Sequence, residues 1–146
     1  MSAIARLQQT LHQDIPLTRA MQLEVGDYDG ERLLLTAPLP PNINDKGTAF
    51  GGSLYSLAVL CGWSLLRLKL EEAGLKKNIV IHEATTRYLL PVNEALHAEC
   101  SLPLAAWESF LHTLQQRDRA RIALTVVIRQ QGKPAVEFTG QYVAHD

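Results

Sequence analysis

Cysteine, net charge and long uninterrupted apolar runs are all scarce in this sequence. Only two cysteines, Cys61 and Cys100, occur in 146 residues, and their spacing matches neither a disulfide framework nor a metal site. The 14 Lys and Arg residues nearly balance 15 Asp and Glu residues, so no broad field attracts nucleic acid or anionic lipid. No stretch reaches the roughly 20 apolar residues of a membrane span, and no signal-peptide pattern opens the chain. We therefore expect a cytoplasmic protein with reduced core cysteines that binds neither nucleic acid nor membrane.

The chain has enough residues and apolar content for one domain with a real core. A 3.6-residue periodicity predicts a short helix at Ile4–Leu11, and the turn pair Asp29-Gly30 joins two expected strands, Gln22–Tyr28 and Arg32–Ala37. Residues 105–118 fit either a helix or an irregular crossover. Alternating or β-branched apolar residues predict four later strands, at Ile79–Leu90, Leu96–Leu102, Arg121–Gln130 and Ala135–Ala144.

A helix from Ser53 to about Glu72 is the most distinctive element expected, because apolar residues occur on all of its faces. Such a helix is buried on most sides. Strands gathered around one helix, without regular βαβ alternation, indicate an α+β fold in which an antiparallel sheet wraps that helix. An open sheet edge would remain, and pairing with a second copy would cover it, so we expect at least a dimer.

The loop that precedes this helix carries the candidate chemistry. Gly51 and Gly52 stand where the first backbone N–H groups of a helix lack internal partners and where the helix dipole adds positive charge. Without a Cβ, they allow a carbonyl oxygen to approach, so they are candidates for an oxyanion hole; alternatively they only permit close packing. Ser53 is expected to cap the helix or bond to a ligand.

Four short motifs stand out along the chain: Pro41-Asn42-Ile43-Asn44, Phe50-Gly51-Gly52-Ser53-Leu54-Tyr55, Gly62-Trp63 and Arg87-Tyr88-Leu89-Leu90-Pro91-Val92. Together they resemble the hotdog-fold thioesterase superfamily that acts on acyl-CoA and acyl carrier protein, and within it the bacterial YiiD C-terminal type. The resemblance implies one hotdog domain over residues 1–146 and a homodimer with two interface sites, each built from the helix start of one chain and strand residues of the other. It also implies substrates that share pantetheine, with no separate cofactor. Pairing of dimers into tetramers stays open.

The chain departs from the pattern of many such thioesterases, which have His before the Gly-Gly pair and an acid seven positions after it. Phe50 and Val59 occupy those places. The helix therefore offers no carboxylate to activate water. The nearest acids, Asp45 and Glu83, also fit ordinary surface charges.

Two amides, Asn42 and Asn44, can orient groups without taking a proton. Alternatively, each caps the loop or bonds to its own backbone. Loss of carbon dioxide from a malonyl thioester needs a hole for the enolate oxygen and an arm for the carboxylate, but no base. The related group includes malonyl-acyl-carrier-protein decarboxylases that supply acetyl primers for fatty-acid synthesis, and their Pro-Asn-x-Asn motif matches Pro41 to Asn44. By that resemblance Asn44 is the best catalytic candidate. Two readings stay open beside it: hydrolysis of acyl thioesters, with Asp45 or a partner group as base, and a non-catalytic acyl-carrier-binding module.

The remaining candidates have structural alternatives. Thr85, Thr86 and Tyr88 either project hydroxyls into the partner's site or simply favour a strand. Arg87 meets a carrier phosphate or carboxylate, or forms a salt bridge. Tyr55 and Trp63 fit core positions better than stacking on a ligand, and the five histidines show no ligand spacing, so we assign no metal. The basic group Arg117, Arg119 and Arg121 reads as a solvated helix end and strand start, or as a surface for an acidic carrier.

Overall fold

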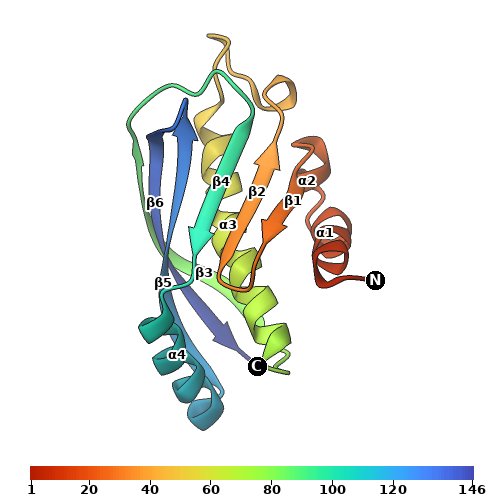
Figure 1. Ribbon diagram of the computed structural model, residues 1–146, viewed down its shortest axis with the longest axis vertical. Coiled ribbons are helices and arrows are strands. Elements are labelled where there is room, and N and C mark those ends of the chain that lie inside the picture. Colours follow the sequence, from red (N-terminus) through yellow and green to blue (C-terminus); the bar gives the residue numbers. More distant parts are fainter.

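Helix α3 (Gly51–Glu72) lies inside the curve of a six-stranded antiparallel sheet in the computed structural model, which describes residues 1–146 (Figure 1). The strand order is β1-β2-β4-β5-β6-β3, so β1 and β3 are the edges. The strands are β1 (Glu24–Tyr28), β2 (Arg32–Ala37), β3 (Asn78–Tyr88), β4 (Leu96–Ser101), β5 (Arg119–Gln130) and β6 (Lys133–His145). The other helices are α1 (Ala3–Asp14), α2 (Leu17–Ala20), a 3-10 turn at Pro40–Asn42 and α4 (Leu104–Arg117).

The α+β architecture expected from the sequence is confirmed, as are all six strands, with ends shifted by a few residues. Three elements were not predicted outright: α2, the 3-10 turn, and α4, which resolves the ambiguous 105–118 segment as helix. Helix α3 begins at Gly51 rather than Ser53. Ser53 therefore lies inside the first turn and does not cap it, which corrects the capping expectation.

The sheet approaches α3 closely at Gly62. A Cβ built on Gly62 would lie only 2.5 Å from the hydroxyl oxygen of Tyr142 on β6. That hydroxyl donates a hydrogen bond to the carbonyl oxygen of Val59 at 2.6 Å. Because Gly62 has no side chain, the fully buried Tyr142 can bond to the helix backbone. This hydrogen bond holds the helix and the sheet together.

Both cysteines lie in this core. Cys61 on α3 and Cys100 on β4 are both fully buried and unbonded, which confirms the expectation of reduced core residues. Burial raises the pKa of the Cys61 thiol well above its usual range, and it raises that of Cys100 to about 12. Both groups therefore remain neutral thiols at physiological pH and behave as small apolar side chains.

The apolar composition of α3 also requires a correction. With 22 residues, α3 is long and apolar enough to cross a membrane by length and composition, contrary to the expectation that no stretch would be. Its most apolar window is 61% buried within the fold. The sheet that surrounds the helix therefore accounts for this composition.

The two edges of the sheet differ. The backbone N–H of Val25 on β1 donates to the side-chain oxygen of Gln8 on α1, so a helix covers part of this edge. Strand β3 pairs only with β6, and its other edge is open. Exposed large apolar side chains lie on or near β3 and the start of α3, namely Phe50, Tyr55, Val80, Tyr88, Leu89 and Leu90. An open strand edge beside apolar surface is a surface suited to a partner.

Candidate active site at the start of the central helix

The first turn of α3 presents three unpaired backbone donors. The N–H groups of Gly51, Gly52 and Ser53 have no hydrogen-bond acceptor in the chain, and Phe50, at the N-cap position, offers no capping side chain. The first internal bond runs from the N–H of Leu54 to the carbonyl of Phe50 at 3.0 Å. Unpaired donors at the positive end of a 22-residue helix suit a negatively charged oxygen.

The two glycines have different neighbours. A Cβ on Gly52 would meet the ring of Phe50 well inside van der Waals contact. A Cβ on Gly51 would lie 3.6 Å from the ring of Tyr88, an ordinary contact. Gly52 therefore accommodates Phe50, whose half-exposed ring forms an apolar wall beside the donors, rather than close packing against the sheet.

Asn42 holds the loop from within the protein. Its side-chain amide donates to the backbone carbonyl oxygens of Met21 at 2.9 Å and Pro38 at 2.8 Å. The backbone carbonyl of Asn42 accepts a hydrogen bond from the N–H of Phe50 at 2.8 Å. The residue is 1% exposed, so it does not reach a bound substrate. The structure thus gives Asn42 the loop-supporting role that the sequence left open, not the catalytic one.

Asn44 closes the loop near the helix start. Its side-chain oxygen accepts from the N–H groups of Lys46 at 2.8 Å and Thr48 at 3.1 Å. Its side-chain nitrogen donates to the Thr48 hydroxyl at 2.9 Å and to the carbonyl of Ala49 at a long 3.5 Å. The oxygen is therefore fully used, whereas one amide hydrogen is only weakly engaged.

The two candidate acids are solvated. The side chain of Asp45 is 82% exposed and pairs with the neighbouring Lys46 at 3.2 Å. Glu83 is exposed at the bulge of β3. Neither carboxylate forms a hydrogen bond with the helix start, and Val59, in the position of the usual acid, only supplies its backbone carbonyl to Tyr142. No acid–base pair is assembled within the chain.

The end of β3 meets the helix start of its own chain. The hydroxyl of Tyr88 donates to the carbonyl oxygen of Gly51 at 3.0 Å. Burial, with a further contribution from Tyr55, raises the pKa of Tyr88, so the phenol stays protonated and acts as a donor. The sequence left open whether this hydroxyl enters the partner's site or the residue simply favours a strand. The contact joins residues 37 positions apart, and no local pattern indicates it.

The other candidate residues on β3 lie on different faces of the sheet. The hydroxyl oxygen of Thr86 is buried without a hydrogen-bond partner. Thr85 is exposed and lies opposite Thr139 of β6. Arg87 is 3.6 Å from the carboxylate of Glu137 and forms the surface salt bridge that was one of its two expected roles. Thr86 is therefore the strand hydroxyl left free on the helix side of the sheet.

Trp63 packs against the core as expected, whereas Tyr55 is 37% exposed. Tyr55 packs edge-to-face on Phe138, and the indole N–H of Trp63 donates to the carbonyl of Ile79 at 3.2 Å. Arg117, Arg119 and Arg121 are exposed at the end of α4 and the start of β5.

A sheet wrapped around a central helix whose start lies open at one end defines the hotdog class of proteins. Within that class, the chain belongs to the family described as "Putative thioesterase (yiiD_Cterm)", whose model matches residues 4–146. Members of this family are acyl-thioester enzymes by that description, and the motifs around Asn42 and Gly51 are those by which the sequence resembles it.

Three solved structures are similar over nearly their whole length. A protein of unknown function from Chlorobaculum tepidum is 38% identical, with a TM-score of 0.93, and the match covers 97% of this chain and 93% of that one. A protein from Shewanella oneidensis, described as a "putative thioesterase", is 32% identical with a TM-score of 0.87, covering 99% and 98%. A thioesterase from Haemophilus influenzae is 17% identical with a TM-score of 0.73, covering 99% and 90%, and shows the shared fold alone.

The buried amide of Asn42 gives the first prediction. Asn42→Ala leaves the carbonyls of Met21 and Pro38 without their donor, so the free energy of unfolding should fall by about 2 to 3 kcal/mol. Urea denaturation measures this loss. The control is Gln115→Ala on α4, which removes an exposed amide without a side-chain hydrogen bond and should change stability by less than about 0.5 kcal/mol. Equal effects of the two variants would contradict the role given to Asn42.

Proposed function

We propose that the protein removes carbon dioxide from a malonyl thioester carried on coenzyme A or acyl carrier protein. The observation that carries this proposal is the set of unpaired N–H groups at Gly51, Gly52 and Ser53, beside which no carboxylate or imidazole is bonded. The site thus offers charge stabilisation without a base. Decarboxylation of a malonyl thioester has this requirement, because its carboxylate leaves without prior proton removal.

The reaction needs negative charge to move onto the thioester oxygen. The C–C bond to the carboxylate breaks, its electron pair forms the enolate, and carbon dioxide leaves. Backbone N–H groups of the helix start would hold the enolate oxygen, and each such donor is worth about 3 to 4 kcal/mol of transition-state stabilisation. A proton from water then completes the acetyl thioester. The ring of Phe50 would limit water around the developing charge.

The carboxylate requires an arm that holds it out of the thioester plane. Asn44 remains our candidate, because its hydrogen bond to the carbonyl of Ala49 is 3.5 Å long and that weakly engaged amide hydrogen would be available to a substrate carboxylate. The three shorter bonds to Lys46 and Thr48 would keep the residue in place.

Hydrolysis of acyl thioesters is the second candidate. The name of the family and the description of the Shewanella oneidensis protein both favour it. It would use the same oxyanion hole, with water activated by a group from a partner chain, since Asp45 is solvated and paired with Lys46.

We further propose that the active form is a homodimer joined through β3. This strand has an open edge, and half-exposed Val80 and Tyr88 lie on it. Two copies related by a two-fold axis can pair such edges in antiparallel fashion and extend the sheet. The same contact would shield the exposed side of Tyr55 on α3.

Product analysis separates the candidate reactions. The pure protein is incubated with malonyl and medium-chain acyl thioesters of coenzyme A and of acyl carrier protein, and products are identified by mass spectrometry. Acetyl thioester is the expected product, released only from malonyl substrates. Free thiol would instead favour hydrolysis, and retention of the acyl chain without turnover would favour a binding module.

The same assay tests the role of Asn44 through two variants. Asn44→Asp keeps an oxygen that accepts from Lys46 and Thr48 but loses the amide donors, and Asn44→Ala loses both. Turnover should fall by about 100-fold or more in each, as for other oxyanion or substrate donors. Unchanged turnover by Asn44→Asp would remove Asn44 from the catalytic groups.

Light scattering tests the dimer. The measured mass should be twice that of one chain, which is 16.2 kDa. Val80→Asp places a charge on the β3 edge, where charges discourage pairing, and should raise the dimer dissociation constant at least tenfold. Leu17→Asp is the control, because Leu17 is 54% exposed, against 47% for Val80, but lies on α2. A monomeric wild-type protein would contradict the interface.

A further inference from the structure

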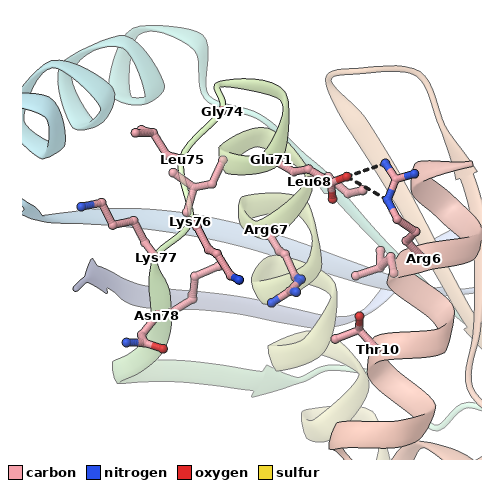
Figure 2. A pocket seen from close by; sticks show the side chains of 13 residues that line it. Arg6, Thr10, Arg67, Leu68, Glu71, Gly74, Leu75, Lys76, Lys77 and Asn78 are labelled. Atoms are coloured by element: carbon pink, nitrogen blue, oxygen red, sulfur yellow. Dashed lines mark hydrogen bonds and ion pairs between the residues drawn. The ribbon is translucent and has the colours of Figure 1, made fainter.

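A cavity of about 810 Å³ lies at the opposite end of α3 from the helix start (Figure 2). Its walls come from α1, the last turns of α3, the following loop and the first residues of β3. The volume is in the range of small-molecule sites. Apolar side chains line part of it, namely Leu7, Leu68, Leu70, Leu75 and Ile79.

One cation in this cavity is held in place without a counter-ion. The guanidinium carbon of Arg67 lies 5.4 Å from the ring centroid of Trp63. The indole N–H donates to the carbonyl of Ile79 at 3.2 Å, which fixes the ring beneath the guanidinium. No carboxylate pairs with Arg67, so a positioned guanidinium remains free to bind an anion.

A second free cation faces the first. Lys76 forms no ion pair, and Figure 2 shows its side chain extending towards the guanidinium of Arg67. The neighbouring cations are already compensated: Arg6 donates through Nε to Glu71 at 3.0 Å, and Lys77 is bonded to Asp118 at 3.3 Å and to Asp146. Two uncompensated cations that converge on one space favour an anion between them. Arginine's planar fork and lysine's point charge together suit a phosphate.

Within one chain this cavity is too far from the helix start to serve it. Arg67 follows Gly51 by 16 residues of α3, about 24 Å along the axis, and Figure 1 shows the two ends of the helix at opposite ends of the fold. The proposed dimer changes this relation. Antiparallel pairing along the whole of β3 (Asn78–Tyr88) sets Asn78 of one chain beside the partner's Tyr88. Asn78 lines the cavity, whereas Tyr88 binds the carbonyl of Gly51.

We infer that the cavity binds a phosphate of a pantetheine-linked substrate whose thioester lies at the partner's helix start. This inference rests on the proposed function and names how the same site holds its substrate. Arg67 and Lys76 would bind the phosphate, and the apolar wall that includes Leu75 and Ile79 would contact the dimethyl end of the pantetheine arm. The phosphate is either the 4′-phosphate of phosphopantetheine or a nucleotide phosphate of coenzyme A.

Calorimetric titration of the full chain tests the phosphate site without any turnover. The probes are coenzyme A, 4′-phosphopantetheine and pantetheine, which lacks phosphate. The variant is Arg67→Met/Lys76→Met, which removes both charges but keeps most of each side chain's apolar length. The control is Arg19→Ala/Arg117→Ala, which removes two exposed cations elsewhere. Unchanged thermal unfolding shows that each variant is folded.

The double methionine variant should raise the dissociation constant of coenzyme A at least tenfold, since charge-assisted hydrogen bonds are lost. The control should stay within about twofold of wild type, and pantetheine should bind both proteins equally. If 4′-phosphopantetheine shows the same loss, the 4′-phosphate is the ligand; if only coenzyme A does, the nucleotide phosphates are. Equal affinity of wild type and variant for coenzyme A, or no binding by wild type, overturns the inference. Charge-dependent binding without turnover of any thioester would overturn the proposed reaction and leave this site standing.

Labelling tests the placement across the interface. A heterodimer is prepared from an affinity-tagged wild-type chain and an untagged Arg67→Met/Lys76→Met chain, and coenzyme A with a photoreactive acyl group on its thiol is added. The intact cavity belongs to the tagged chain, so residues 42–53 of the untagged chain should be labelled. Labelling of the tagged chain's own loop would overturn the placement.

Discussion

Burial of α3 on almost every side is the constraint on which the rest of the structure depends. The sheet encloses the helix, and at Gly62 the side chain of Tyr142 reaches in to bond to the backbone of Val59. A helix enclosed in this way meets solvent mainly at its ends. Its start therefore becomes the place where unpaired N–H groups and the positive end of the helix dipole are accessible.

The elements around the helix start hold that end open without filling it. Asn42 ties the loop to two carbonyls inside the fold, and Asn44 closes the loop on itself. Tyr88 fixes the end of β3 to Gly51. None of these bonds uses the N–H groups of Gly51, Gly52 or Ser53, so the supporting bonds leave these three donors free. Because β3 is both the support of the helix start and the open edge of the sheet, a dimer formed through it would bring a second chain to the same site.

Local patterns in the sequence were sufficient for much of this fold. Apolar periodicity predicted all six strands and the buried helix, because each signal lies within about ten to twenty residues. The partners of Asn42 were not predictable, since Met21 and Pro38 come near it only through the way the chain folds back. The Tyr88 contact and the cavity cations Arg67 and Lys76 were missed for the same reason: they combine segments without a shared motif. The Gly51-Gly52 pair was recognisable because helix starts have a local chemistry of their own.

If the N–H groups at the start of α3 bind a thioester oxygen, the vibration of that carbonyl will change on binding. Infrared difference spectra of acetyl-coenzyme A labelled with carbon-13 at the carbonyl would be recorded free and bound to the protein. Hydrogen bonds from the helix start should weaken the carbonyl bond and shift its stretching band to lower frequency than in water. A bound carbonyl band at or above its frequency in water would contradict the account.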